Sequence, residues 1–164
     1  MGTGKSSVGR QVASVLGFTF LDTDDVIEAR AGKPIKAIFE QDGEPAFRNL
    51  ERRIVAELAH REKTVIATGG GLPVGPGNLA SLKTHALVVC LWASPESIFE
   101  RVEGQNHRPL LNEPDPMERI RGLLSAREPF YRQADVLVNT EMRSVREVAA
   151  QVSHQFHLAQ AAHR

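Results

Sequence analysis

Short apolar runs alternate with longer segments of mixed polarity along this chain. Four of the runs are continuous and rich in β-branched residues, a pattern typical of strands that are covered on both faces. The predicted strands are 18–23 (FTFLDT), 64–68 (TVIAT), 86–93 (ALVVCLWA) and 135–139 (DVLVN). The pattern also predicts that Cys90 and Trp92, on the third of these strands, belong to the core.

The segments between these strands carry apolar residues at helical spacing, as in the stripe formed by Phe47, Leu50, Ile54 and Leu58. The main predicted helices are 5–16, 46–61, 95–103, 115–133 and 144–162, and a further helix begins at Asp25. Helices therefore alternate with strands along the whole chain. This order predicts a three-layer α/β fold with a mostly parallel sheet, in one domain spanning residues 1–164.

Charge and cysteine content narrow the functions open to the chain. The 20 basic and 20 acidic residues cancel, so no overall attraction to nucleic acid or to a membrane surface is expected. No apolar run approaches the length of a membrane span, and the single cysteine rules out an internal disulfide. We expect a cytoplasmic monomer that acts on a small molecule.

The first residues, MGTGKSS, contain most of a phosphate-binding loop. Glycines let backbone N–H groups converge on phosphate oxygens, and the following helix adds the positive end of its dipole. In such loops the lysine, here Lys5, reaches the β- and γ-phosphates, and the next hydroxyl, here Ser6, ligates magnesium. The predicted nucleotide-binding residues are Gly2, Thr3, Gly4, Lys5, Ser6 and Ser7. The alternative is a glycine-rich helix cap with a solvated lysine, because the sequence lacks the motif's first glycine and the strand before it.

A phosphate site that binds magnesium needs a carboxylate near the metal. Among the predicted strands, only the first ends in acidic residues, Asp22, Asp24 and Asp25. Because side chains alternate along a strand, Asp22 and Asp24 lie on one side. Asp22 is predicted to serve the metal, and Asp24 to face the group that accepts the phosphoryl group. The alternative is that one of them, Asp24 for instance, only caps the helix that begins at Asp25.

Three consecutive glycines, Gly69, Gly70 and Gly71, follow the second predicted strand. Such a run has a large conformational cost and is expected where backbone approaches a ligand closely, although a flexible turn is the alternative. Arg48 and Glu51 are three residues apart on a predicted helix, and taken alone they indicate a solvated surface pair.

The segment 104–116 contains three prolines and shows no sustained periodicity between two predicted helices. It is therefore predicted to be a mobile surface loop. Arg108 lies in it, followed by a proline and two leucines. The loop is either a passive connector or a cationic flap that closes over a ligand.

The stretches MGTGKSS, LDTD, GEPAFRNLE, VIATGGG, RPLL and SAREPFYRQAD, taken together and in this order, resemble shikimate kinases. The resemblance implies ATP- and magnesium-dependent phosphorylation of the 3-hydroxyl of shikimate, giving shikimate 3-phosphate and ADP on the route to aromatic amino acids. It implies a P-loop kinase fold with five parallel strands in the order 2-3-1-4-5. It also implies a substrate-binding helical segment at about 25–61 and a mobile lid at about 104–116.

The resemblance assigns a role to each matching residue. Lys5 and Ser6 would hold the phosphates and magnesium, with Asp22 in the outer shell of the metal. Asp24 would bind the hydroxyls of shikimate and orient or deprotonate the attacking one. Arg48 and Arg127 would clamp the shikimate carboxylate, with Gly69, Gly70 and Gly71 donating backbone N–H groups and Glu51 holding Arg48. Arg108 would reach the transferring phosphate, and Arg101 and, on a looser alignment, Arg143 would approach the adenine.

In the family order, the strand that precedes the phosphate loop lies at the centre of the sheet. We therefore expect about ten more residues upstream of Met1, ending in a glycine and one further residue, so that Met1 is internal to the loop. Without that strand, poor folding and weak ATP binding are expected. The alternatives in function are another small-molecule kinase of this fold, such as a gluconate kinase, or a nucleotide-binding module without catalysis.

Overall fold

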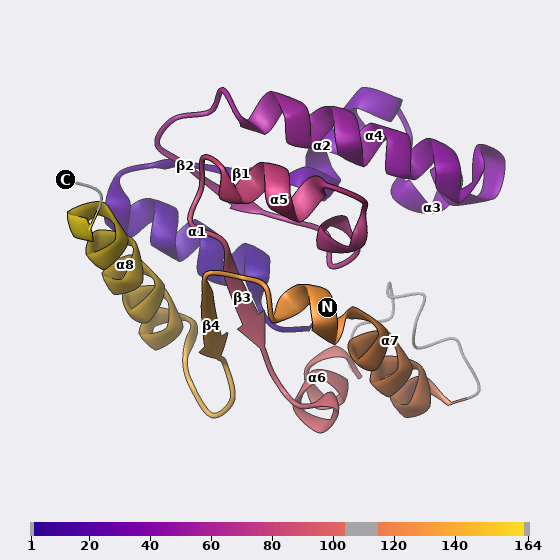
Figure 1. Ribbon diagram of the computed structural model, residues 1–164. Coiled ribbons are helices and arrows are strands. Elements are labelled where there is room, and N and C mark those ends of the chain that lie inside the picture. Colours follow the sequence, from indigo (N-terminus) through magenta and orange to yellow (C-terminus); the bar gives the residue numbers. More distant parts are fainter. Residues whose placement is uncertain (1, 104–114, 163–164) are drawn as a thin grey trace.

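The computed structural model describes residues 2–103 and 115–162, so Arg108 and most of the predicted lid lie outside the described residues. Its elements follow the alternating order expected from the sequence (Figure 1). They are α1 (Lys5–Leu16), β1 (Thr19–Asp22), α2 (Thr23–Ala31), α3 (Ile35–Gln41), α4 (Gly43–Leu58), β2 (Thr64–Ala67), the 3₁₀ helix η1 (Leu72–Val74), α5 (Asn78–Lys83), β3 (Val89–Trp92), α6 (Pro95–Val102), α7 (Pro116–Tyr131), β4 (Val136–Asn139) and α8 (Val145–Ala162). The α/β class is confirmed. The short elements α3, η1 and α5 were not predicted, and α2 begins at Thr23 instead of Asp25.

The strands form two parallel pairs in the described part of the chain. β1 pairs with β2, with Asp22 opposite Ala67, and β3 pairs with β4, with Trp92 opposite Asn139. This pairing agrees with the family order 2-3-1-4-5, which counts the strand before the phosphate loop as strand 1. In that numbering, β1 and β2 of this structure are strands 2 and 3, and β3 and β4 are strands 4 and 5. Strand 1 separates the two pairs. Parallel strands bring their carboxyl ends to one edge, and in open α/β sheets ligands bind outside that edge.

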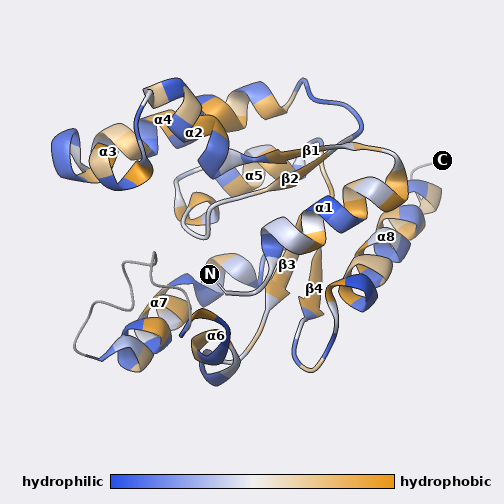
Figure 2. Cartoon of the chain, turned by 180° about the vertical axis from the view of Figure 1, so that it is seen from behind, coloured by the Kyte–Doolittle hydropathy of each residue, from blue (hydrophilic) through white to orange (hydrophobic). Residues whose placement is uncertain are grey.

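Helix α1 packs against both strand pairs. Its Val8 and Val12 share one buried cluster with Val65 of β2, Val89 of β3 and residues of α8. Figure 2 shows α1 and α8 with mixed hydropathy, whereas β3 and β4 are largely hydrophobic. The cluster therefore ties β2 and β3 to one helix, although no strand ladder joins these two strands within the described ranges.

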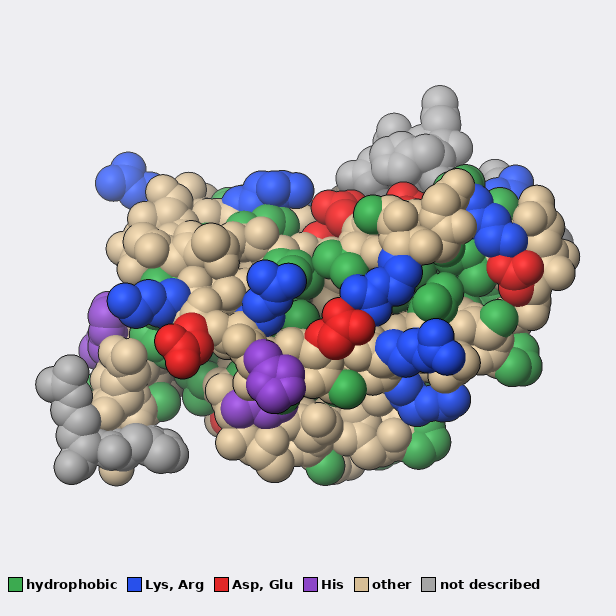
Figure 3. Space-filling view, turned by 90° about the horizontal axis from the view of Figure 1, so that it is seen from above, with side chains coloured by type: hydrophobic (Ala, Val, Ile, Leu, Met, Phe, Trp, Pro, Cys, Tyr) green, Lys and Arg blue, Asp and Glu red, His purple; other side chains and the backbone are tan. Residues whose placement is uncertain are grey.

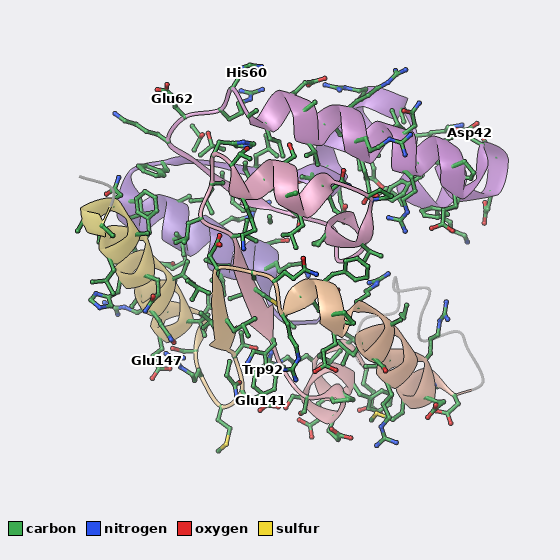
Figure 4. The ribbon with its side chains drawn as sticks, viewed as in Figure 1. Asp42, His60, Glu62, Trp92, Glu141 and Glu147 are labelled. Carbon is green, nitrogen blue, oxygen red and sulfur yellow. The ribbon has the colours of Figure 1, made fainter. Side chains whose placement is uncertain are left out.

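The prediction that Trp92 belongs to the core is wrong, and Cys90 is buried only in part. The side chain of Trp92 is 44% exposed, and Cys90 is only half-buried. Side chains alternate between the faces of a strand, and Val89 and Leu91 already occupy the face that packs on α1 and α8. Residues 90 and 92 point to the other face, and Figure 4 shows Trp92 at the carboxyl end of β3.

Helices α2, α3 and α4 form a second apolar cluster over the β1–β2 pair. Its buried members include Ile27, Ile38, Phe47, Ile54 and Leu72.

Seen from above, positive side chains are spread over the surface in small groups, several of them beside acidic ones (Figure 3). Among the helices in residues 2–103 and 115–162, none is long and apolar enough to cross a membrane.

Candidate active site

A cleft of about 470 Å³ opens beside the amino end of α1 and the carboxyl ends of β1 and β2. It brings together most of the site residues predicted from separate segments of the sequence. Its lining residues are Gly2, Gly4, Lys5, Ser6, Ser7, Asp22, Asp24, Thr68, Gly69, Gly70, Arg101 and Arg127. Thr68 was not predicted, and only its position next to the glycine run could have indicated it.

The phosphate loop leads directly into α1. Gly4 caps the helix with φ 82°, a left-handed conformation that favours glycine, and no described side chain caps the helix. The amide groups of the first turn have no partner within the helix, and they bring the positive end of the dipole to the cleft. Lys5 and Ser6, the first two helical residues, line the same cleft. This arrangement suits an anion with several oxygens, such as a polyphosphate.

Ser6 and Asp22 bring two oxygen donors together at the cleft. The Ser6 hydroxyl donates to Asp22 Oδ2 at 2.7 Å, and Asp22 Oδ1 accepts the Asp24 backbone N–H at 3.1 Å. The expectation that one of these acids caps the helix is therefore confirmed for Asp22 and wrong for Asp24. Magnesium takes oxygen ligands and usually keeps waters and substrate phosphates, so this pair fits its chemistry.

Asp24 lies half-buried against the glycine run. Burial, with the nearby charge of Asp22, raises the pKa of Asp24 to about 6, although Lys5 opposes the shift. A Cβ on Gly69 would stand 2.6 Å from Asp24 Oδ1, so a side chain at this position would displace the carboxylate. The Gly69 N–H donates to the hydroxyl of Thr23 at 3.1 Å. The run is therefore anchored backbone in close contact with the carboxylate, and the flexible-turn interpretation is not supported.

Half-buried Arg48 pairs with a buried glutamate, Glu51. Arg48 Nη1 donates to Glu51 Oε2 at 2.6 Å, and Glu51 is only 1% exposed. Burial raises the pKa of Glu51 although the guanidinium of Arg48 opposes the shift. A Cβ on Gly71 would come within 2.8 Å of Arg48 Nη1. The interpretation as a solvated surface pair is wrong, because packing from outside the helix covers Glu51.

Replacing Glu51 with alanine should lower the free energy of unfolding by about 1–3 kcal/mol, because the guanidinium of Arg48 loses the buried acceptor that it binds at 2.6 Å. The matched control is Glu44→Ala. Glu44 binds the same arginine at 2.9 Å, but its side chain is 61% exposed. An exposed pair contributes about 0–1 kcal/mol. Urea unfolding of both variants measures the difference, and equal losses would contradict a special role for the buried partner.

Arg101 is fixed at the cleft by the loop that follows β4. Its guanidinium donates to the Thr140 hydroxyl at 2.8 Å and to the Thr140 carbonyl at 2.7 Å. Glu141, labelled in Figure 4, accepts from the Ser94 N–H at 2.8 Å and the Ser97 hydroxyl at 3.0 Å, which ties this loop to α6. These bonds hold the Arg101 side chain at the edge of the cleft.

Among the described residues, four of the predicted site residues do not line the cleft. Thr3 is buried, and the guanidinium of Arg48 lies against Gly71, next to the part of the glycine run that lines the cleft. Arg143 donates instead to Asn139 and Gln151 on β4 and α8.

Sequence reasoning missed Tyr131, whose hydroxyl donates to the Gly70 carbonyl at 2.7 Å. Its position four residues after Arg127 on α7 was the available signal, because such residues share a helix face.

Comparison with known proteins agrees with this geometry. The family model for shikimate kinase matches residues 1–157. The chain belongs to the shikimate kinase family. The shikimate kinase of Caldanaerobacter subterraneus subsp. tengcongensis is 43% identical over 93% of this chain and 89% of its own length. That of Thermodesulfovibrio yellowstonii is 42% identical, over 95% and 90%.

Solved shikimate kinase structures share the fold. The Acinetobacter baumannii enzyme in complex with shikimate matches with a TM-score of 0.89 and 38% identity, over 98% of this chain and 89% of that one. The Bacteroides thetaiotaomicron enzyme matches with a TM-score of 0.89 and 32% identity, over 96% and 94%. The expected P-loop kinase fold is confirmed.

Proposed function

We propose that this chain phosphorylates the 3-hydroxyl of shikimate with ATP, giving shikimate 3-phosphate and ADP. The observation that carries the proposal is a single cleft that holds Lys5 and Ser6 of the phosphate loop, the carboxylate of Asp24, and Arg127. A phosphate cradle, a proton acceptor and a cation for an acid group are the three parts that this reaction needs. Membership of the family and the shikimate bound to the Acinetobacter relative support it.

The nucleotide half of the cleft would position the phosphates. The first-turn amides and Lys5 would neutralise the β- and γ-phosphate oxygens, and Arg101 would lie against the adenine. Ser6 and Asp22 would hold magnesium, which supplies further neutralisation of the phosphate charge when bound. Phosphoryl transfer asks mainly for such positioning and charge stabilisation, with little covalent work by the protein.

The other half would receive a small anionic polyol. Planar guanidinium groups suit a carboxylate, and Arg127, with Arg48 beside Gly71 at the end of the glycine run, would supply the clamp. Asp24 would accept the proton of the attacking hydroxyl as its oxygen bonds to the γ-phosphorus and the bond to ADP breaks. With a pKa of about 6, Asp24 is mostly ionised at neutral pH and still basic enough to take a proton.

Replacing Asp24 with asparagine should lower kcat by about 10²–10⁴-fold, because the amide cannot take the proton. The stability of the variant, by contrast, should stay the same or rise. The folded pKa of Asp24 lies above its unfolded value, so its ionised form costs the folded state free energy at neutral pH. The neutral amide removes that cost, and thermal unfolding in metal-free buffer should show an unchanged or higher Tm. Asp25→Asn, an exposed neighbour, is the control. A variant that loses both activity and stability would contradict the assignment.

A coupled ADP-release assay tests the function directly. The probes are shikimate, gluconate and AMP, each with ATP and magnesium. Of the three acceptors, only shikimate should give turnover. Preference for gluconate would favour the gluconate-kinase alternative, and ATP binding without turnover on any acceptor would favour a non-catalytic module.

A further inference from the structure

Tyr131 connects two parts of the site that are far apart in sequence. It is the last residue of α7, and it lies half-buried one helical turn beyond Arg127. Its hydroxyl donates to the Gly70 carbonyl at 2.7 Å, a typical length for an O–H···O bond. One bond thus joins the end of α7 to the glycine run after β2.

Gly70 occupies the centre of that run. On one side Gly69 stands against the carboxylate of Asp24, and on the other Gly71 stands against the guanidinium of Arg48. The carbonyls of Gly69 and Gly71 accept N–H groups of the η1 turn at 3.1 Å. The carbonyl of Gly70 accepts from Tyr131 on α7 instead, so this bond orients the peptide between the Asp24 carboxylate and the Arg48 guanidinium.

The side chain of Arg127 lies next to this hydroxyl. Arg127 stands four residues earlier on α7, and both side chains line the same small pocket. Burial raises the pKa of Tyr131 above its ordinary value, although the nearby charge of Arg127 opposes the shift. The hydroxyl is therefore protonated at neutral pH. It donates its proton to the Gly70 carbonyl, and its lone pairs remain available to accept from Arg127.

We propose that Tyr131 is a positioning residue. It holds the Arg127 side chain and the Gly70 peptide in a fixed relative position before the carboxylate of the substrate binds. The inference rests on the proposed function, because it assigns Arg127 to the substrate carboxylate. The hydroxyl joins the arginine on α7 to the backbone that holds Asp24 and Arg48. Without this link, Arg127 would have to be ordered at the moment of binding, which costs affinity.

Tyr131→Phe tests the proposal because it keeps the ring and removes only the hydroxyl. The KM for shikimate should rise about tenfold, equivalent to ~1.4 kcal/mol, while kcat and the KM for ATP change less than about threefold. Thr84→Val is the matched control. Its hydroxyl makes a 2.6 Å bond to the Ser81 carbonyl at the end of α5, and its loss should leave both KM values unchanged.

A double-mutant cycle with Arg127→Ala separates positioning from packing. If Tyr131 acts through Arg127, Tyr131→Phe should change the shikimate KM less than about twofold in the Arg127→Ala background. An unchanged KM in the single variant would overturn the proposal, as would parallel rises for shikimate and ATP, or a full effect in the Arg127→Ala background. Turnover of shikimate by the wild type is measured first, so a failure of the proposed function is recognised separately.

Discussion

Lys5→Ala should remove measurable turnover, a loss of at least about 10²–10³-fold in kcat. Lys5 is the first residue of α1 and lines the cleft beside the first-turn amides. Its charge would meet the oxygens of the transferring phosphoryl group, where negative charge is concentrated during the reaction. Shikimate binding in the absence of nucleotide should change little, because the proposed carboxylate clamp lies on other elements.

Arg127→Ala tests the substrate half of the site, as Lys5→Ala tests the nucleotide half. The shikimate KM should rise about 30-fold or more, since truncating one partner of a buried charge pair costs ~2–5 kcal/mol. ATP affinity should remain nearly intact. Arg132→Ala, an exposed arginine on the turn after α7 that pairs with Glu128, controls for loss of charge in this region. Steady-state kinetics and calorimetric titration with each substrate measure the split. Equal losses of ATP affinity in Lys5→Ala and Arg127→Ala would contradict the division of roles.

The parts of the site that could be predicted are those whose residues lie close together in the sequence. The phosphate loop, the acids after the first strand and the triple glycine each sit in one short stretch, and the structure gathers most of them in one cleft. The alternation of apolar runs and amphipathic segments likewise predicted the α/β order, because burial on both faces of a parallel sheet demands continuous apolar strands.

The parts that were missed depend on contacts between distant segments. Spacing alone made Arg48 and Glu51 a surface pair. Glu51 is buried, however, because it lies on α4, which packs against α2, α3 and α5. The helix spacing places Tyr131 beside Arg127, but its bond to a carbonyl 61 residues earlier is indicated by no local pattern. Trp92 was placed in the core because its run is apolar, but the face on which it lies depends on which helices cover the strand.

An apolar segment added before Met1, in the central position that the family order gives to its first strand, should stabilise the folded chain. β2 and β3 both pack on α1, yet within the described residues each hydrogen bonds only to its outer neighbour, β1 or β4. An apolar extension of about ten residues, ending in glycine and one more residue before Met1, could pair with both strands in the order that the family implies. Each new ladder bond contributes about 0.5–1.5 kcal/mol net, and the buried apolar side chains add to this.

The expected result is a rise in Tm of about 10 °C or more for the extended chain, since 1 kcal/mol moves the Tm of a domain this size by about 2–4 °C. The KM for ATP should fall as well, because the added glycine completes the phosphate loop ahead of Gly4. The matched control is an extension of equal length with proline at consecutive central positions, so that those residues donate to neither neighbouring strand. Circular dichroism melting and kinetics compare the two chains. A proline extension that stabilised the protein equally would show that apolar cover alone is responsible, because it lacks the donors that a ladder on either side needs.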